Sequence, residues 1–254
     1  MAVHPRLSVN EECAGSLPFA DEVTFWRELG VDTIGAISPK LEEIGWDTDV
    51  VLAAGLQVDN IGTEQRVINE SIDFAAAACA GSVWFTSGTI GSRLWEEAAD
   101  EFCEHVAPAV ASARAVGVTL AVEPTNPLRA DISFVFTLRD SLALAREAGI
   151  SVVLELACCW YERGLEALVR EHVDRIALVQ ISDYVLGTLD TPNRAAIGDG
   201  DIPLERLMGI LLDAGYAGSF DLEILGPRIA AEGHLAATRR SLDRATEMLD
   251  RLGA

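Results

Sequence analysis

The sequence predicts an α/β protein whose parallel strands close into one (β/α)₈ barrel over residues 1–254. Three observations lead to this prediction. Short apolar runs alternate with helical stretches eight times, without a long linker or low-complexity segment. A chain of 254 residues, half of them hydrophobic, has the size of one α/β barrel. Runs such as VVLEL are apolar except for Glu155 near their end, as in parallel strands that are covered on both faces.

The elements of the first half are recognised from apolar runs and end signals. A strand at Leu7–Asn10 comes first, and a helix at about Asp21–Leu29 follows, with Gly30 as its C′ glycine. The next elements are a strand at Thr33–Ile37, a helix near Asp49–Ala54 that stops at Gly55, a strand at Leu56–Ile61, a helix at Glu64–Ala80, the strand SVWFT from Ser82, and a long helix that Ser92 caps and Gly117 ends, with a bend expected at Pro108.

The second half repeats the pattern four times. Its strands are expected at Val118–Glu123, Ser151–Leu156, Arg175–Ile181 and Ser219–Leu225. Its helices are expected at Leu138–Ala148 with Thr137 as N-cap, Gly164–Glu171, Pro203–Ala214 and Gly233–Leu252. An open doubly wound sheet is the alternative, but Glu11, Glu12 and Cys13 follow the first strand where that fold places a glycine-rich phosphate loop. The closed barrel is therefore preferred.

Composition limits the partners. The net charge of −21, from 40 acidic and 19 basic residues, argues against nucleic acid and against an anionic membrane surface. No signal peptide and no apolar run near the ~20 residues of a membrane span is seen, so a cytoplasmic protein with a small-molecule substrate is expected. The five cysteines form no CxxC motif, which favours reduced thiols. The oligomeric state is left open, and a homo-oligomer is compatible.

Acidic strand ends point to a site. Apolar runs of three strands stop at Glu123, Glu155 and Glu223, and LVQISD ends similarly with Gln180 and Asp183. In a barrel, the carboxyl ends of all strands open onto one face. Burying an unpaired charge costs several kcal/mol, so carboxylates at buried strand ends need a reason. We expect these side chains to converge on one site.

Three carboxylates and an amide form an all-oxygen environment. Such ligands suit Mn²⁺ or Mg²⁺, with Ca²⁺ as an alternative, better than zinc. Without a cation, neighbouring glutamates raise one another's pKa values and repel. A divalent metal held by Glu123, Glu155, Gln180 and Glu223 is therefore predicted. The alternative is that each glutamate pairs with an arginine at the barrel rim.

Four segments carry a family resemblance: LAVEPTNP, VVLELACC, LVQISD and NRAAIGDGDIPLERLMGILLDAGYAGSFDLEILGP. They resemble the xylose isomerase-like barrels of the sugar phosphate isomerase/epimerase superfamily. The resemblance implies that a glutamate, an aspartate, a histidine and a glutamate on strands 5 to 8 hold one divalent metal. It also implies that the two glutamates, Glu123 and Glu223 in this sequence, move the proton in epimerisation or isomerisation.

The sequence departs from the family at three of these positions. Glu155 stands where the aspartate is expected and is one methylene longer. Gln180 replaces the histidine ligand, and Cys158 replaces a histidine that contacts substrate. The acid–base pair is retained, but a weaker or differently tuned metal site is implied, and loss of the metal is an open alternative.

Other residues are candidates for substrate contact. Arg194 matches an arginine that related epimerases place near the substrate, although it could instead pair with Asp199 or Asp201. Asp183 resembles the family's second acid after strand 7, with a helix cap as the alternative. Lys40 is expected to pair with Glu42 or Glu43 rather than with an anionic substrate. The remaining candidates, with core packing as the alternative, are Trp84, Phe85, Cys158, Trp160 and Tyr161. Cys158 and Cys159 could form a soft ligand pair, but adjacent side chains of an extended chain point to opposite sides, so two buried small residues are expected.

Three functions are compatible with these residues. The first is a metal-dependent sugar isomerase or epimerase that works through an enediolate. The second is a dehydratase on the same scaffold, similar to inosose or dehydroshikimate dehydratases, which shares the first half of the reaction. The third is a metal-free barrel that only binds a small molecule. The isomerase or epimerase is preferred.

Overall fold

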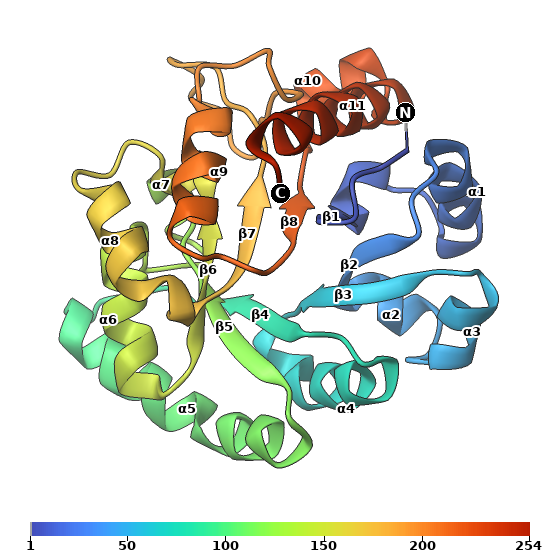
Figure 1. Ribbon diagram of the computed structural model, residues 1–254. Coiled ribbons are helices and arrows are strands. Elements are labelled where there is room, and N and C mark those ends of the chain that lie inside the picture. The colour runs from blue at the N-terminus through green and yellow to red at the C-terminus, as the bar shows by residue number, and fades with distance from the viewer. Residues whose placement is uncertain (1) are drawn as a thin grey trace.

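The computed structural model describes residues 2–254 and shows a closed barrel of eight parallel strands, joined in the order β1 to β8 (Figure 1). The predicted (β/α)₈ barrel is therefore confirmed. The strands are β1 Leu7–Asn10, β2 Thr33–Ile37, β3 Gln57–Gly62, β4 Ser82–Thr86, β5 Thr119–Glu123, β6 Ser151–Glu155, β7 Ile176–Ile181 and β8 Phe220–Leu222. Each strand hydrogen-bonds to its two neighbours, and β1 pairs with β8 to close the ring.

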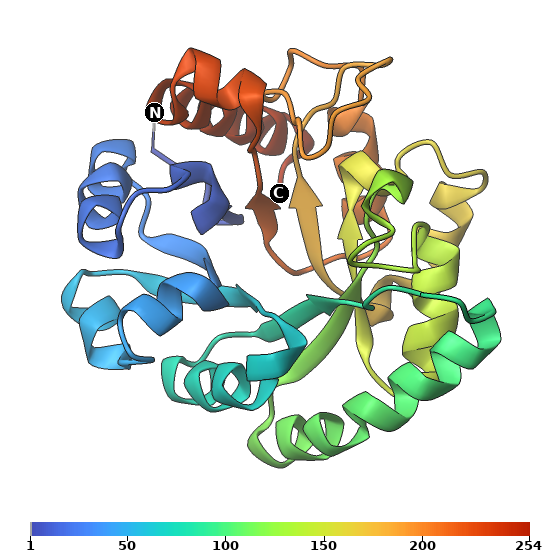
Figure 2. The same cartoon turned by 180° about the vertical axis from the view of Figure 1, so that it is seen from behind.

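Helices surround the barrel and are seen from the opposite side in Figure 2. The α-helices are α1 Phe19–Leu29, α2 Ser38–Glu43, α3 Thr48–Ala53, α4 Ile68–Ala78, α5 Trp95–Val116, α6 Leu138–Ala148, α7 Leu156–Cys159, α8 Leu165–His172, α9 Leu204–Asp213, α10 Pro227–Glu232 and α11 His234–Leu252. Short 3₁₀ turns, η1 Glu11–Ala14, η2 Gln65–Val67, η3 Pro127–Arg129 and η4 Val173–Arg175, complete the described chain.

Several element boundaries differ from the sequence prediction. Ser92 is not the cap of α5, because the helix begins after Leu94, whose backbone N–H donates to Glu97 Oε2 over 3.0 Å. The strand predicted at Ser219–Leu225 is shorter, partly because the carbonyl of Leu225 accepts from Arg194 N (2.9 Å). The short helices α2, α7 and α10 were missed, since each follows a strand end within a few residues and has little periodic pattern.

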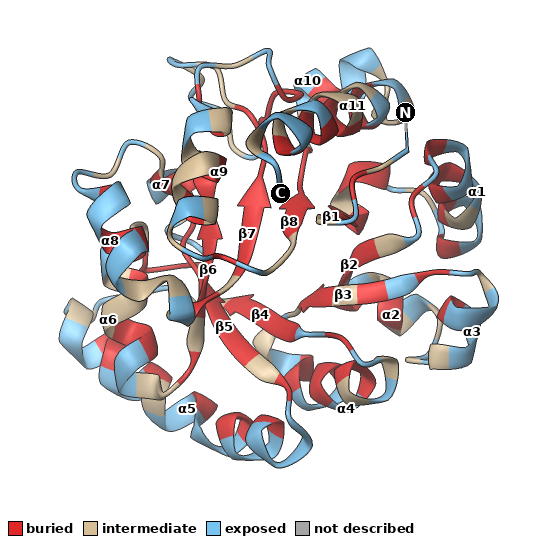
Figure 3. Cartoon of the chain, viewed as in Figure 1, coloured by how far each residue is buried: buried red, intermediate tan, exposed pale blue. Residues whose placement is uncertain are grey.

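The apolar core lies mainly between the strands and the helix ring. Strand residues are buried almost without interruption, whereas the helices alternate buried inner and exposed outer faces (Figure 3). Inside the barrel a smaller apolar cluster of Trp84, Ala121, Val153 and Leu178 fills one part. Asp221 occupies another part, where it accepts hydrogen bonds from Ser8 Oγ (2.6 Å) and Asn10 Nδ2 (3.1 Å). The interior is thus a packed floor beneath the carboxyl ends of the strands.

Within residues 2–254, no helix has the length and apolar character that a membrane span requires.

Candidate active site

The strand ends bring the predicted glutamates to the carboxyl face of the barrel. Glu123 is the last residue of β5, and Glu155 is the last residue of β6. Gln180 lies in β7 directly beside Glu155 in the register. Glu223 follows β8, and its backbone N–H still pairs with the carbonyl of Ile181 over 3.0 Å. Because parallel strands end on one face, these four positions are neighbours although the sequence separates them widely.

A cavity of about 320 Å³ opens at this face. Five residues predicted from the sequence line it: Trp84, Glu123, Cys158, Arg194 and Glu223. We call it the mouth pocket. Glu155 and Gln180 lie beneath it, and both are fully buried. Among these five residues, Glu123 and Glu223 present carboxyl groups to the pocket and Arg194 presents a guanidinium, with a second layer of polar groups under them.

Glu155 is engaged by the protein at both oxygens. As the N-cap of α7, its Oε1 accepts from the backbone N–H of Ala157 over 2.8 Å. Its Oε2 accepts from Cys158 Sγ (3.3 Å) and forms an ion pair with Arg194 Nη2. A carboxylate at a helix start also interacts favourably with the helix dipole. Glu155 is therefore held in one orientation by its own surroundings.

Arg194 is carried by a loop that Asp183 organises. Asp183 Oδ1 accepts from the backbone N–H groups of Tyr184 (2.9 Å) and Ile202 (3.1 Å). Its Oδ2 accepts from Gly198 (2.9 Å) and Gly200 (3.0 Å). A Cβ at Gly200 would lie 2.2 Å from Asp183 Oδ1, so this wrapping requires glycine there. Asp183 thus holds the loop rather than lining the mouth pocket.

The alternative partners considered for Arg194 are not the ones it contacts. Asp199 pairs with Arg240 (2.6 Å) and Arg244 (2.7 Å) on the surface, and Asp201 Oδ2 accepts from the backbone N–H of Leu186 (2.8 Å). Arg194 instead turns inward to Glu155 and is 8% exposed. Its position near a buried glutamate agrees with the prediction that placed it at the site.

Gln180 and Glu223 form a second contact in the polar layer. Gln180 Nε2 donates to Glu223 Oε1 over 3.2 Å. Within residues 2–254, Gln180 Oε1 is buried and has no hydrogen-bond partner. The glutamine therefore presents a donor, not a lone pair, to the carboxyl group beside it.

Burial and mutual repulsion dominate the electrostatics of the mouth pocket. Burial, then the charge of Glu155, raise the pKa of Glu123 to about 8, and Arg194 opposes the shift. The pKa of Glu223 is raised well above its ordinary value by burial and by Glu123 and Glu155. Burial disfavours the cationic form of Arg194, but Glu155, Cys158 and Glu223 together outweigh this and raise its pKa, so the guanidinium stays charged. Burial, with Glu155, also raises the pKa of Cys158, which stays a neutral thiol.

Other predicted contacts lie outside the mouth pocket. Phe85 and Cys159 are buried in the core, as the packing alternative expected. Trp160 packs edge-on against Tyr161, a residue that is 57% exposed. The predicted partners of Lys40 were wrong, because its Nζ pairs with Glu22 Oε1 at 2.7 Å and not with Glu42 or Glu43. Glu22 lies on α1, far from Lys40 in sequence, and no local spacing indicates it.

The sequence reasoning also missed residues that line the mouth pocket. Glu12 follows β1 by two positions, Thr125 and Asn126 follow β5, and Arg129 ends η3. Asn126 Oδ1 accepts from the N–H of Leu128 over 2.9 Å and so shapes its own turn. Their one common signal is position: each stands just beyond the carboxyl end of a strand.

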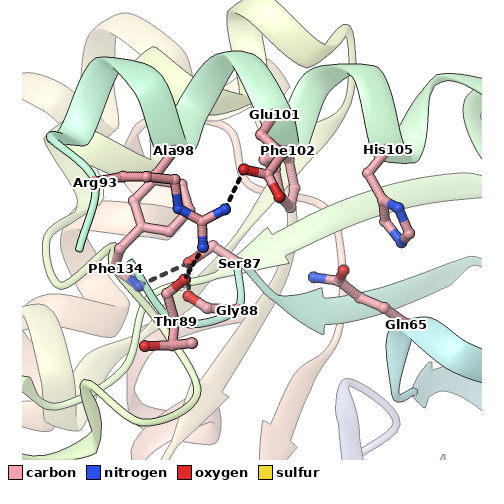
Figure 4. Close-up of a pocket in the computed structure, with 10 residues that line it drawn as sticks. All are labelled: Gln65, Ser87, Gly88, Thr89, Arg93, Ala98, Glu101, Phe102, His105 and Phe134. Carbon is pink, nitrogen blue, oxygen red and sulfur yellow. Dashed lines mark hydrogen bonds and ion pairs between the residues drawn. The ribbon is translucent and has the colours of Figure 1, made fainter. Parts of the chain in front are cut away.

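A second hollow of about 210 Å³ lies between α5 and the segment after β4 (Figure 4). Arg93 forms an ion pair with Glu101 there and donates to the carbonyl of Thr89 over 3.2 Å. Ser87 Oγ accepts from the N–H of Phe134 over 2.9 Å. These groups are paired with one another across the hollow. The hollow therefore differs from the mouth pocket, where groups of like charge are crowded together.

Comparison with known protein families identifies the family of this chain. The model of the xylose isomerase-like TIM barrel matches residues 58–251, more than half of the chain. The chain therefore belongs to the xylose isomerase-like TIM barrel family, and the resemblance predicted from the sequence is confirmed.

Solved structures agree on the fold. The protein SMc04130 from Sinorhizobium meliloti is 23% identical, with a TM-score of 0.82 and 98% of both chains covered. An L-ribulose 3-epimerase is 17% identical, with a TM-score of 0.77, covering 100% of this chain and 96% of its own. The IolI protein, solved with a zinc atom, is 14% identical, with a TM-score of 0.77 over 97% and 99% of the chains. No curated protein matches the chain at a significant level.

The family resemblance implies a divalent metal, and the residues present do not fit one. Among residues 2–254, no three His, Cys, Asp or Glu side chains are grouped as metal ligands. The contacts explain this: both oxygens of Glu155 are occupied, and Gln180 turns its amide N–H toward Glu223. Arg194 adds a fixed positive charge that would repel a cation.

Proposed function

We propose that this protein is an isomerase or epimerase that acts on a small polyhydroxy ketone or aldose. The observation that supports it best is that Glu123 and Glu223 line one pocket together with Arg194. Family membership and the epimerases among proteins of the same fold are in keeping with this class of reaction. Fold likeness alone cannot name the substrate, so the proposal depends on the pocket.

Two carboxyl groups at one pocket suit a proton transfer in two steps. In the first, an ionised glutamate removes the proton on the carbon next to the substrate carbonyl, which leaves an enediolate. In the second, the other glutamate, in its protonated form, returns a proton to the neighbouring carbon or to the opposite face. Glu123 ends β5 and Glu223 follows β8, so they reach the pocket from separate strands of the ring. Each can therefore address a different side of one substrate.

The lining of the mouth pocket favours an uncharged substrate. About 320 Å³ is near the lower end of the volumes that small-molecule sites show. Four acidic residues line it, namely Glu12, Glu64, Glu123 and Glu223, against the two arginines Arg129 and Arg194. Arg129 is already paired with Asp131 at 3.0 Å, and Arg194 with Glu155. A phosphate group would meet more negative than free positive charge, so we propose a free sugar or cyclitol.

The other predicted attributes remain part of the proposal. A cytoplasmic location and a small-molecule partner are proposed, and the net charge of −21 supports the lack of nucleic-acid or anionic-membrane partners. Binding of Mn²⁺ or Mg²⁺, which the family resemblance implies, is not part of this proposal, because the residues present do not fit a divalent metal.

Deuterium uptake tests the proposed reaction. Free ketoses, aldoses and keto-cyclitols would be incubated with the protein in D₂O and followed by proton NMR. We expect one of them to exchange the proton on the carbon next to its carbonyl and to form an isomer or epimer. Loss of water after exchange would indicate the dehydratase alternative instead. Saturable binding of a sugar without any exchange would contradict the proposal and favour a barrel that only binds.

A further inference from the structure

The polar layer under the mouth pocket contains a buried ion pair of an unusual kind. Arg194 and Glu155 have side chains that are 9% and 0% exposed. Buried ion pairs cost desolvation, and such a pair is retained where the geometry is good and further hydrogen bonds satisfy both groups. Glu155 meets this condition through Ala157 and Cys158, but Arg194 does not.

Arg194 has donors that the protein leaves unused. Its Nη2 contacts Glu155 Oε2 and, at 3.8 Å, Cys158 Sγ. Its Nε is buried and, within residues 2–254, has no hydrogen-bond partner. A guanidinium carries five N–H donors in one plane, and a buried donor without a partner is costly. Because Arg194 lines the mouth pocket, a ligand oxygen is the natural acceptor for those of its N–H groups that face the pocket and are not bonded to Glu155.

The length of Glu155 decides where the positive charge lies. Its carboxylate reaches Arg194 while also capping α7, and the two residues are 39 positions apart in sequence. The loop that carries Arg194 is fixed by Asp183, so the guanidinium is not free to swing away. The cation therefore lies among Glu123, Glu155 and Glu223, where a divalent metal would be expected from the family resemblance.

We infer that Arg194 is the fixed cation of this site and replaces a divalent metal in stabilising the enediolate. This inference rests on the proposed function for its catalytic half. When a glutamate takes the proton, the C–H bond breaks and its electrons form a C=C bond. The carbonyl electrons move onto oxygen, and the N–H groups of Arg194 donate to that oxyanion without losing a proton. Glu155 acts through Arg194 as a positioning residue.

A metal titration tests the replacement independently of any substrate. Calorimetry of the wild-type protein with Mn²⁺ and with Mg²⁺ should show no saturable binding up to millimolar concentration. The variant Glu155→Asp/Gln180→His/Arg194→Met removes the guanidinium, shortens the acid and adds an imidazole, and it should bind Mn²⁺ saturably. Saturable binding to the wild type would overturn the inference. Failure of the triple variant to bind would overturn it as well, because the arginine would not then be what excludes the metal.

A second experiment tests the catalytic half, using the substrate found by deuterium exchange. Wild-type activity should survive treatment with EDTA. Arg194→Met should lower kcat by about 10²- to 10³-fold, the usual loss when one oxyanion donor is removed. Arg194→Lys, which keeps the charge, should recover part of kcat. Arg170→Met, an exposed arginine on α8 that pairs with Glu166, is the matched control and should leave kcat within about twofold, as surface pairs contribute little.

The outcomes separate the two proposals. If Arg194→Met fails to fold, the double variant Arg194→Met/Glu155→Gln leaves no buried charge without its partner and should show the same loss of kcat. Activity that EDTA abolishes and Mn²⁺ restores would overturn this inference while leaving the isomerase proposal intact. If no substrate exchanges deuterium, the isomerase proposal fails, and the metal titration still decides whether Arg194 excludes a cation.

Discussion

Two clusters of buried acids lie beyond the carboxyl ends of the barrel strands, and only one of them reaches the mouth pocket. The first cluster, after β1 and β2, contains Glu11, Glu22 and Lys40. There Lys40 Nζ pairs with Glu22 Oε1 at 2.7 Å, and Glu11 Oε2 accepts from the N–H of Ile37 at 2.7 Å. We call it the sealed cluster, because its members do not line the mouth pocket.

The second cluster contains Glu123, Glu155, Glu223 and Arg194 and reaches the mouth pocket. We call it the mouth cluster. The pKa values of Glu123 and Glu223 in this cluster are raised, and so are those of the two acids in the sealed cluster. Burial, above all, raises the pKa of Glu22 to about 7 and that of Glu11 well above its ordinary value. Perturbed pKa values are therefore not what distinguishes an active site here. Access to a cavity distinguishes it.

The cations of the two clusters show the same contrast. The ammonium group of Lys40 interacts with two groups of the protein, the Glu22 carboxylate and the carbonyl of Leu17. Arg194 is used on one side by Glu155 and keeps donors for a ligand on the other. A compact ammonium suits a closed pair, whereas a planar guanidinium can bind two groups at once. The sealed cluster therefore has a structural role, whereas the mouth cluster has hydrogen-bond donors left for a substrate.

The largest expected effect comes from removing a base in one cluster and not in the other. Glu123→Gln and Glu223→Gln should each lower the rate of isomerisation by about 10²- to 10⁴-fold, the usual contribution of general acid–base catalysis. Glu22→Gln, an equally conservative change in the sealed cluster, should leave the rate within about threefold per folded molecule, because Glu22 does not line the mouth pocket. Steady-state kinetics measure all three. Near-wild-type turnover in both mouth variants would contradict the two-glutamate reaction.

The sequence predicted the strand-end glutamates because local signals carry them. Glu123 and Glu155 each close an apolar run, and parallel topology then brings their strand ends to one face. Gln180 was expected to offer an oxygen, yet it donates its N–H to Glu223. That difference arises because the neighbouring carboxyl group accepts hydrogen bonds, which the sequence position alone does not show.

Pairings across the barrel could not be read from local pattern. Arg194 reaches Glu155 only because Asp183 folds the intervening loop around four backbone N–H groups. Lys40 reaches Glu22 because the start of α1 lies near α2, where Phe19 N–H donates to Glu43 Oε1 over 3.1 Å. The prediction had instead chosen the acids that are next to Lys40 in the sequence. Long flexible side chains take their partners from tertiary structure, and several acids lie within reach in a chain this acidic.

Breaking the pair in the sealed cluster should cost stability rather than activity. Lys40→Met leaves Glu22, which is fully buried, without its cation, and removing one partner of a buried pair typically costs about 3–5 kcal/mol. Denaturant unfolding at pH 8 should show a loss of this size. Lys40→Arg, which keeps the charge, is the control and should lose less. A free energy of unfolding equal to that of the wild type would mean that the pair contributes nothing.

The same pair gives a pH dependence of defined sign. The pKa of Glu22 is about 7 in the folded protein against an ordinary value of 4.5. Between these values the folded state binds more protons, so this group's contribution to stability is present at low pH and is lost as pH rises toward 7. Lys40→Met should therefore cost only about 1 kcal/mol at pH 5, where Glu22 is protonated and a hydrogen bond is lost. An equal loss at pH 5 and pH 8 would contradict this assignment.

A smaller effect is expected at the wall of the mouth pocket. A Cβ at Gly62 would lie 2.5 Å from Trp84 Cζ2, so Gly62→Ala must displace the indole that donates to Asn60 Oδ1 over 2.8 Å. Overpacking of this kind typically costs about 1–3 kcal/mol, and the Michaelis constant should rise with it. Gly81→Ala, whose Cβ would meet only the carbonyl of Asp59 at 3.4 Å, is the matched control. Unchanged stability and tryptophan emission in Gly62→Ala would contradict a packed role for Trp84.

The smallest effect concerns Cys158, which the sequence placed at a substrate-binding position. Its thiol lies 3.3 Å from Glu155 Oε2 and is kept neutral, since burial raises its pKa well above the ordinary value. A neutral thiol is a weak hydrogen-bond donor, so Cys158→Ala should change kcat/KM by no more than about threefold.

Thiol chemistry gives the matching measurement. Cys79 is exposed and should react rapidly with a disulfide reagent, whereas Cys158 in a Cys79→Ala background should react only as fast as the protein unfolds. If Cys158→Ala instead lowers kcat/KM more than about tenfold while the fold is retained, the thiol takes part in substrate binding. The mouth cluster would then depend on a third kind of group besides its carboxylates and its guanidinium.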